Sequence, residues 1–403
     1  MRRVSGAARP DWQKKVESVG LTWHSLEQPY WNESAYYEFT AKEVDVLEAA
    51  TNELEAMTLA AAQHVIDNRL YSRLGIPESA APLIETSWEA EPPSLYGRFD
   101  LAYDGSQPPK LLEYNADTPT SLLEAAVVQW YWLQDLFPKR DQFNSIHERL
   151  VALWKELTPY LPGRRIDFCS MDDAEDGMTV TYLQDTAQQA GLEASIFPID
   201  EIGWDGQSFV GPDDQPLGAV FKLYPWEWMV HEEFGQHLAK SDTIWIEPPW
   251  KMLLSNKGIL PVLWQLYPRH PYLLEARFDG PGLMMSWVKK PLLGREGANV
   301  TLHQPGVHIE TEGDYGEEGF VWQELAPLKQ FDGLYPVIGS WVIGHEEGNV
   351  AAGMGIRESD TPITGNTSRF VPHLFGPDTD QALSDKLKQA PVRYGRMHLK
   401  SGL

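Results

Sequence analysis

The chain has 403 residues, which at roughly 150 residues per domain is enough for two or three domains. Hydrophobic residues make up 42% and charged residues 23%, ordinary values for a globular protein that exclude disorder as its main state. Acidic residues outnumber basic ones by 58 to 33, and the net charge of −25 would repel nucleic-acid backbones and anionic membranes. We therefore expect neither a nucleic-acid partner nor a membrane partner.

The hydropathy of the chain indicates a cytoplasmic protein. After Met1-Arg2-Arg3 there is no apolar stretch of the kind that a signal peptide needs. No uncharged apolar run approaches the length of a membrane-spanning helix.

The first predicted element follows about 40 residues that are rich in aromatic and loop-forming side chains. Thr40 and Glu43 have the spacing of a capping box, and apolar residues then recur at helical intervals over 47–65. A strand is predicted at 110–115 after two turn signals, and an apolar helix at 121–137.

The middle of the chain has the pattern of an α/β domain. A strand-like run at 165–169 is followed by a helical pattern at 179–190 and a second strand at 194–199, which predicts a βαβ unit. Runs rich in β-branched and aromatic residues at 218–223 and 243–247 predict further strands.

From residue 285 the sequence alternates short strands with glycine-containing turns. The candidate strands are 286–290, 299–302, 319–324, 336–343 and 349–356. We expect the last two to pair as a hairpin across 344–348.

A first cluster of polar residues could hold a metal ion. Glu113 and Asn115 share one face of their strand because side chains alternate, and Asp100 could add a third oxygen. Such oxygens suit a hard cation such as Mg²⁺. Arg98 stands two residues before Asp100 and could meet a phosphate beside that metal. The alternative is a hydrogen-bonded loop anchored by an Arg–Asp pair.

A second cluster lies between two predicted strands, at 289–299. Gly294 and Gly297 would let backbone N–H groups approach phosphate oxygens, and Lys290 and Arg295 would add positive charge. The run lacks the Gly-Lys-Ser/Thr of a Walker A motif. An ordinary hairpin with a basic tip explains it equally well.

Two further segments could contact a nucleotide. The loop at 255–260 enters a helix with Lys257 behind a serine and an asparagine, which suits an anion site but also plain N-capping. The apolar strand at 321–325 ends in Gln323 and Glu324, whose backbone could read an adenine edge.

Together these stretches resemble the synthetase domain of the glutathionylspermidine synthase family of ATP-grasp ligases, and most of all its stand-alone bacterial acid–amine ligases. The resemblance extends over about residues 20–375. The motifs that carry it are Arg98-Phe99-Asp100, Leu112-Glu113-Tyr114-Asn115-Ala116-Asp117, Glu247-Pro248-Pro249-Trp250, Asn256-Lys257-Gly258, Lys290-Pro291 through Gly294-Arg295, and Gly355-Ile356-Arg357.

The resemblance implies a mixed α/β and α+β architecture. An ATP-grasp fold would hold the nucleotide between two α+β lobes, beside an α/β domain like the pre-ATP-grasp domain. The implied division is a helical and metal-motif region at 1–160, the α/β domain at 161–250, the ATP-grasp lobes at 251–375 and a tail at 376–403.

The same resemblance implies roles for individual residues. Arg98 would face the terminal phosphate and Arg357 would stabilise the transferring phosphoryl group. Asp100, Glu113 and Asn115 would hold two Mg²⁺ ions, and Lys257 and Lys290 would contact the ATP phosphates. Gly294, Arg295 and Gly297 would belong to a lid loop over the nucleotide, and Gln323 and Glu324 would lie at the adenine hinge. The acid substrate would contact Thr118, Thr120 and Glu227.

The resemblance thus implies an ATP-dependent ligase that forms an amide through an acyl phosphate. Its partners would be two small molecules, a peptide-like carboxylic acid and a polyamine or another amine. Two alternatives remain: a catalytically silent nucleotide- or peptide-binding protein on the same fold, and a glycan-active enzyme, which the 16 tryptophans would suit. The oligomeric state is left open, with a homodimer as one option.

Overall fold

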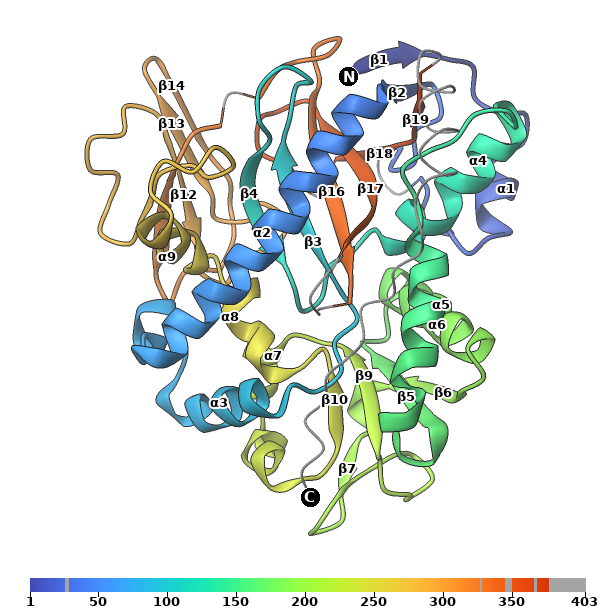
Figure 1. Cartoon of the computed structure of the whole chain (residues 1–403), viewed down its shortest axis with the longest axis vertical. Coiled ribbons are helices and arrows are strands. Elements are labelled where there is room, and N and C mark those ends of the chain that lie inside the picture. The colour runs from blue at the N-terminus through green and yellow to red at the C-terminus, as the bar shows by residue number, and fades with distance from the viewer. Residues whose placement is uncertain (26–28, 327, 345–349, 366–367, 377–403) are drawn as a thin grey trace.

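The computed structural model describes residues 1–25, 29–326, 328–344, 350–365 and 368–376 (Figure 1). Two large hydrophobic cores lie within this part of the chain. One lies beneath the long helix α2 (Ala41–Asp67), and the other includes α5 (Ile146–Leu157) and α6 (Ala174–Gln189).

A five-stranded antiparallel sheet forms the centre of the molecule. Its strands, in spatial order, are β18 (Arg369–Val371), β17 (Val350–Ser359), β16 (Tyr335–Ile343), β3 (Tyr96–Ala102) and β4 (Lys110–Asn115). The pairing of β16 with β3 joins two segments that are far apart in the sequence. The helix α2 crosses one face of this sheet (Figure 1), where Thr51 shares a hydrogen bond with Ser340.

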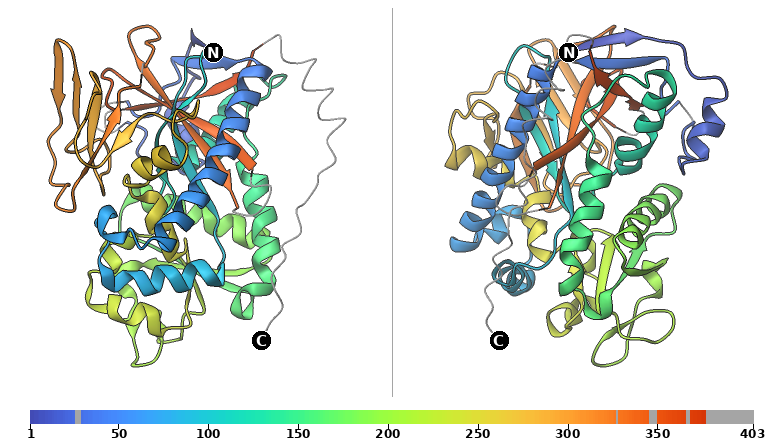
Figure 2. Two further views of the ribbon diagram at one scale, coloured as in Figure 1. Left: turned by 60° about the vertical axis from the view of Figure 1, so that its left-hand side comes forward. Right: turned by 45° about the vertical axis from the view of Figure 1, so that its right-hand side comes forward.

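A second antiparallel sheet stands at one side of the molecule (Figure 2). It contains β11 (Ala276–Arg277), β15 (Phe320–Glu324), β12 (Trp287–Pro291), β13 (Thr301–Gln304) and β14 (Val307–Glu310). The predicted strands at 286–290, 299–302 and 319–324 are confirmed within two residues at either end. The short strand β14 was not predicted.

The predicted βαβ unit is confirmed in a four-stranded parallel sheet. Its order is β10 (Ile244–Ile246), β9 (Ala219–Leu223), β5 (Arg165–Ser170) and β6 (Glu193–Pro198), with α6 connecting β5 to β6. The helix α6 begins five residues before the predicted start because Asp173 caps it, accepting hydrogen bonds from the amides of Glu175 and Asp176.

The N-terminal 40 residues contain more regular structure than their composition indicates. The strands β1 (Arg2–Ser5), β2 (Ala35–Phe39) and β19 (His373–Phe375) form a small sheet, and α1 (Trp12–Glu17) lies between the first two. These strands depend on pairing between the two ends of the described chain, so local sequence carries little signal for them. A two-stranded ribbon of β7 (Gly203–Trp204) and β8 (Phe209–Val210) completes the sheets.

The predicted start of α2 is confirmed by a complete capping box. The Thr40 hydroxyl accepts from the Glu43 amide, and the Glu43 carboxylate accepts from the Thr40 amide at 2.8 Å. The predicted helix at 121–137 is also present, as a π-helical turn at 124–128 that continues into α4. The remaining helices are α3 (Ala81–Ala90), α4 (Gln129–Leu136), α7 (Trp226–Met229), α8 (Met252–Ser255) and α9 (Ile259–Leu266).

Two other expectations concern the strand at 110–115 and the hairpin of β16 and β17. The strand at 110–115 is confirmed with its predicted bounds, and β16 pairs with β17 as expected. The turn that joins β16 to β17 lies mostly outside the described residues, as does the tail at 377–403. In the described part of the chain no helix is long and apolar enough to span a membrane.

Candidate functional site

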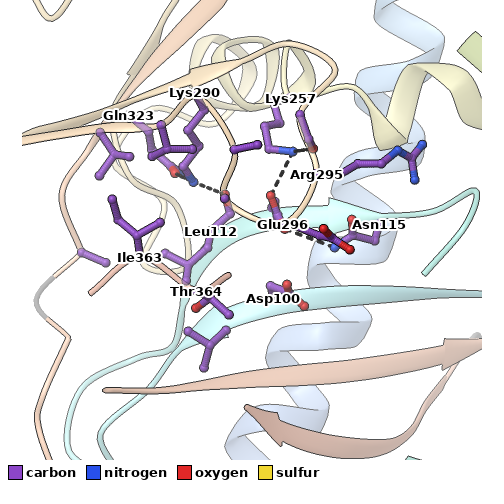
Figure 3. Close-up of a pocket in the computed structure, with 18 of the residues that line it drawn as sticks. Asp100, Leu112, Asn115, Lys257, Lys290, Arg295, Glu296, Gln323, Ile363 and Thr364 are labelled. Carbon is purple, nitrogen blue, oxygen red and sulfur yellow. Dashed lines mark hydrogen bonds and ion pairs between the residues drawn. The ribbon is translucent and has the colours of Figure 1, made fainter. Parts of the chain in front are cut away.

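One pocket brings together nearly all the residues that the sequence singles out (Figure 3). It is bounded by the ends of β3 and β4, the inner face of β12 and β15, and the loop 292–300. The predicted residues that line it are Arg98, Asp100, Glu113, Asn115, Thr118, Thr120, Lys257, Lys290, Gly294, Arg295, Gly297, Gln323, Glu324 and Arg357. Glu227 does not line it and instead contacts Arg295.

The oxygen-bearing side chains come from two paired strands. Asp100 of β3 lies directly opposite Glu113 of β4, and the Asn115 amide donates to Glu113 Oε1 at 3.4 Å. The predicted common face for Glu113 and Asn115 is therefore confirmed. The strand register skips Leu112, and such bulges commonly re-aim groups beside a site.

Two arginines hold the Asp100 carboxylate. Arg98 donates from Nε to Asp100 Oδ1 at 2.7 Å, and Arg357 of β17 donates to Oδ2 at 2.7 Å. Arg98 can lie across β16 because residue 339 is glycine, where a Cβ atom would come within 2.8 Å of Arg98 Cδ. The sequence places Arg98 beside Asp100, but only sheet pairing brings Arg357 to it.

Two lysines approach from the opposite side of the pocket (Figure 3). Lys257 lies 3.1 Å from Glu113 Oε2 and donates to the Gly294 carbonyl at 2.6 Å. Lys290 donates to the Leu112 carbonyl at 2.8 Å and to Gln323 Oε1 at 2.7 Å. The lysines thus connect the loop and β12 to β4, the strand that carries Glu113.

Burial and charge shift the pKa values of two of these groups. Burial alone would raise the pKa of Glu113, but Lys257 and Lys290 hold it well below its usual range, so the carboxylate is ionised. Burial lowers the pKa of Lys290 to about 8. The pocket therefore keeps a permanent negative charge on β4 beside an ammonium whose charge is sensitive to pH.

The segment before α9 is a turn stabilised by a buried asparagine, and no side chain caps the helix itself. Asn256 is fully buried; its side-chain oxygen accepts from the Gly258 amide at 2.8 Å and its amide donates to the Leu74 carbonyl at 2.7 Å. Asn256 therefore stabilises the turn, while the adjacent Lys257 reaches into the pocket.

The loop 292–300 connects β12 to β13 and closes one side of the pocket. Gly297 has φ +69°, and a Cβ atom there would lie 2.6 Å from the Thr364 carbonyl oxygen, so only glycine fits. Arg295 donates to Thr118 Oγ1 at 2.7 Å and to Glu227 Oε1 at 2.6 Å.

The pocket continues into an apolar slot that the sequence reasoning missed. Val288 precedes Lys290 by two residues on β12, so alternation along this predicted strand could have found it. The other apolar residues of the lining include Leu112, Val300, Leu302, Leu325, Ala326, Leu328, Val337 and Ile363. The Gln323 side chain is buried and makes a hydrogen bond at both ends, since its amide nitrogen donates to the Leu111 carbonyl at 2.9 Å and its oxygen accepts from Lys290.

Two residues behind the site were also missed. Asp117 and Lys222 are both buried, and Lys222 Nζ donates to Asp117 Oδ1 at 2.7 Å. This pair fixes the segment that carries Thr118. Among the described residues, no group of three or more histidines, cysteines, aspartates or glutamates could hold a metal ion.

Fold and site together define a mixed α/β protein with a glutathione synthetase-like structure. The chain resembles the solved structure of a glutathione synthetase-like effector from Globodera pallida, with a TM-score of 0.56 over 91% of this chain and 96% of that one at 9% identity. A family model described as "Glutathionylspermidine synthase preATP-grasp" matches residues 3–376. The chain therefore belongs to the glutathionylspermidine synthase family, as its motifs predict.

Three relatives place the chain within this family. It is 46% identical over 398 residues to a Haemophilus influenzae protein named "Putative acid--amine ligase", covering 94% of this chain and 100% of that one. It is 30% identical to trypanothione synthetase of Crithidia fasciculata over 77% of this chain. It is 28% identical to the bifunctional glutathionylspermidine synthetase/amidase of Escherichia coli over 78% of this chain. The matches span 52% and 55%, respectively, of these last two proteins, about half their length.

Proposed function

We propose that this protein is an ATP-dependent ligase that joins a small carboxylic acid to a small amine through an acyl phosphate. One observation carries the proposal. Asp100, Glu113 and Asn115 share a pocket with five basic side chains, and this charged region continues into an apolar slot. Phosphoryl transfer depends mainly on positioning and charge neutralisation, which such a pocket can supply.

The nucleotide would lie along the length of the pocket. Its base fits the apolar slot beside Val288 and Leu302, next to the backbone of the segment that begins at Gln323 and Glu324. Lys257 and Lys290 would meet the phosphates as compact charges, and the loop 292–300, which carries Arg295, would cover them. We place the phosphates beside the two lysines because both side chains reach into the pocket and contact β4, the strand that carries Glu113.

The three oxygen-bearing side chains fit a hard divalent cation. Asp100 and Glu113 offer carboxylate oxygens from two paired strands, and Asn115 adds an amide oxygen beside them. We propose that they hold Mg²⁺, two ions in all, which when bound would neutralise the phosphate charge.

The protein's own groups would serve both steps of the reaction. The substrate carboxylate attacks the γ-phosphorus and ADP leaves, giving an acyl phosphate; the amine then attacks its carbonyl carbon, loses a proton and expels phosphate. Arg98 and Arg357, which meet at Asp100, would face the charge of the moving phosphoryl group. The loop 292–300 would keep water from the acyl phosphate.

Substrate recognition is proposed more broadly. Thr118 and Thr120 line the pocket beside the arginines and would contact the acid, with Glu227 close by. The names of the relatives support a peptide-like acid and a polyamine or other amine. An acidic protein surface would also concentrate a cationic amine.

The domain division is likewise a proposal. The parallel sheet of β5, β6, β9 and β10 falls within 161–250, where a pre-ATP-grasp-like domain is expected. The central sheet takes β3 and β4 from 1–160 and β16 to β18 from 251–375, which supports an N-terminal region packed onto the ATP-grasp lobes. We also propose a cytoplasmic location.

The decisive experiment traps the activated acid. With ATP, Mg²⁺ and a panel of peptides and amino acids, hydroxylamine replaces the natural amine, and both ADP and hydroxamate are measured. A ligase forms hydroxamate in proportion to ADP, only with the right acid. ADP release with a stable phosphoester would indicate a kinase. Folded, ATP-binding protein that no acid stimulates would favour a silent binding protein.

A further inference from the structure

The side chain of Arg295 connects the loop 292–300 to two other parts of the chain. Its two terminal nitrogens donate separately, one to Thr118 Oγ1 at 2.7 Å and the other to Glu227 Oε1 at 2.6 Å. The guanidinium carbon also lies 5.6 Å from the centre of the Trp228 ring. Figure 3 shows the side chain extending away from Lys257 and Lys290. Arg295 is therefore held by the protein itself.

Glu227 stands on a rigid support. It belongs to α7, whose first residue, Trp226, is fully buried and donates its amide to Asp117 Oδ2 at 2.9 Å. The Trp226 indole donates to the Glu247 carbonyl at 2.9 Å. Asp117 is itself held by the buried Lys222. The start of α7, which carries Glu227, is therefore held by the fold independently of the loop.

Glu227 contacts the lining of the pocket through Arg295. It is absent from the pocket lining, and its side chain is 16% exposed against 32% for Arg295. An ion pair at this depth is screened less than a surface pair, and each nitrogen has a defined acceptor. Loss of the Glu227 charge would remove the ion pair and leave the guanidinium with neutral hydrogen-bond acceptors only.

We propose that Glu227 is a positioning residue that anchors Arg295 and thereby holds the loop 292–300 closed over the pocket. Its effect on turnover rests on the proposed function, but its effect on the loop does not. Two amides report the order of the loop: the Ala298 amide donates to the Arg295 carbonyl within the loop at 2.9 Å, and the Asn299 amide donates to the Glu312 carbonyl at 3.1 Å. These hydrogen bonds protect the amides from exchange as long as the loop keeps this conformation.

Amide hydrogen exchange of the loop tests the proposal on the full-length protein without substrate. Glu227→Gln and Arg295→Gln should each accelerate exchange at 297–299 about tenfold, and the double variant should exchange no faster, because all three lose the same contact. Glu227→Asp, which keeps the charge, should restore part of the protection. The matched control is Glu233→Gln, at an exposed site four residues after the end of α7, which should exchange like the wild type.

Three outcomes would overturn the proposal. They are wild-type exchange in Glu227→Gln, equal effects of Glu227→Gln and Glu233→Gln, and additive effects in the double variant. Since Arg295 lies in a loop, Arg295→Gln tests the contact even if the Glu227 variant folds poorly.

Turnover separates this proposal from the ligase proposal. In an active ligase, Glu227→Gln should raise the KM for ATP about tenfold at an unchanged unfolding temperature. Faster loop exchange without acid-dependent ADP release would support the anchor and refute the ligase. Acid-dependent ADP release with unchanged loop exchange in Glu227→Gln would refute the anchor and leave the ligase proposal standing.

Discussion

Asp100 is a buried carboxylate that ion pairs with two arginines stabilise. Its carboxylate is almost fully buried, yet Arg98 and Arg357 each donate to it at 2.7 Å, so the charge is neutralised by hydrogen-bonded partners. Glu113 is balanced by Lys257 in the same way. A buried charge without such partners would cost several kcal/mol, on the order of the stability of a whole domain.

Replacing Glu113 by glutamine tests the proposed cation site. The change keeps the shape and removes the charge, so we expect at least about a 100-fold loss of kcat with a folded protein, because the proposed Mg²⁺ ligand is lost. Steady-state kinetics over a range of Mg²⁺ concentrations and circular dichroism check both parts. Glu193→Gln, at an exposed site on β6, is the control. Full activity of Glu113→Gln at saturating Mg²⁺ would refute the assignment.

Neighbouring lysines on β12 offer a matched pair for testing phosphate binding. Lys290 faces the pocket, whereas the Lys289 ammonium lies 3.8 Å from the centre of the Phe320 ring. A charge-assisted contact contributes about 1.5–3 kcal/mol, so Lys290→Ala should raise the Kd for ATP roughly 10- to 100-fold and Lys289→Ala should leave it nearly unchanged. Calorimetric titration measures both. Equal effects would indicate an ordinary basic strand edge.

At the scale of elements, the Glu247-Pro248-Pro249-Trp250 segment joins the parallel sheet to the central sheet. Glu247, at the end of β10, is fully buried and accepts from the Ser94 hydroxyl and from the amides of Leu95 and Tyr96, next to β3. Lys251 lies 2.5 Å from the same carboxylate. This motif, which the family resemblance rests on, therefore has a structural role outside the pocket.

Glu247→Gln should destabilise the whole fold. It removes the counterion of Lys251, whose side chain is 1% exposed, and an uncompensated buried charge costs about 3–5 kcal/mol. Urea unfolding of this variant should show a free energy of unfolding lower by about that amount. The exposed Glu201→Gln should change it by less than about 0.5 kcal/mol. A loss below about 1 kcal/mol in Glu247→Gln would contradict the role of this residue.

At the scale of the whole molecule, β19 fastens the C-terminal end of the described chain to the N-terminal strand β2. His373 in this strand is buried; its Nδ1 lies 2.8 Å from Gln129 Oε1, and its carbonyl accepts from Gln142. Burial lowers the pKa of His373 to about 3. The imidazole is therefore neutral in the folded protein throughout the physiological pH range.

This histidine predicts a loss of stability in mild acid. Between its ordinary pKa of about 6.5 and its folded value, the unfolded chain binds a proton that the folded chain does not. Stability from His373 is therefore complete above pH 6.5 and falls as pH decreases, by at most about 1.4 kcal/mol per pH unit. Urea unfolding from pH 7.5 to 5 should give a shallower slope in His373→Asn than in the wild type. Parallel curves would contradict this.

Local sequence was sufficient for features that depend on near neighbours. The strand at 110–115, the capping box at Thr40 and the βαβ unit all follow from alternation, helical periodicity and capping chemistry. The common face of Glu113 and Asn115 follows from strand geometry alone. Family membership likewise came from the order of short motifs, and the family comparison confirms it.

Tertiary structure decided which of these local pieces meet. The pairing of β16 with β3 and β17 brings Arg357 to Asp100, and the fold of the loop 292–300 brings Arg295 to Glu227, which does not itself line the pocket. The apolar slot and the small sheet of β1, β2 and β19 were missed for the same reason. A short strand can pair with many partners, and the choice depends on the packing of the whole core, which no local pattern records.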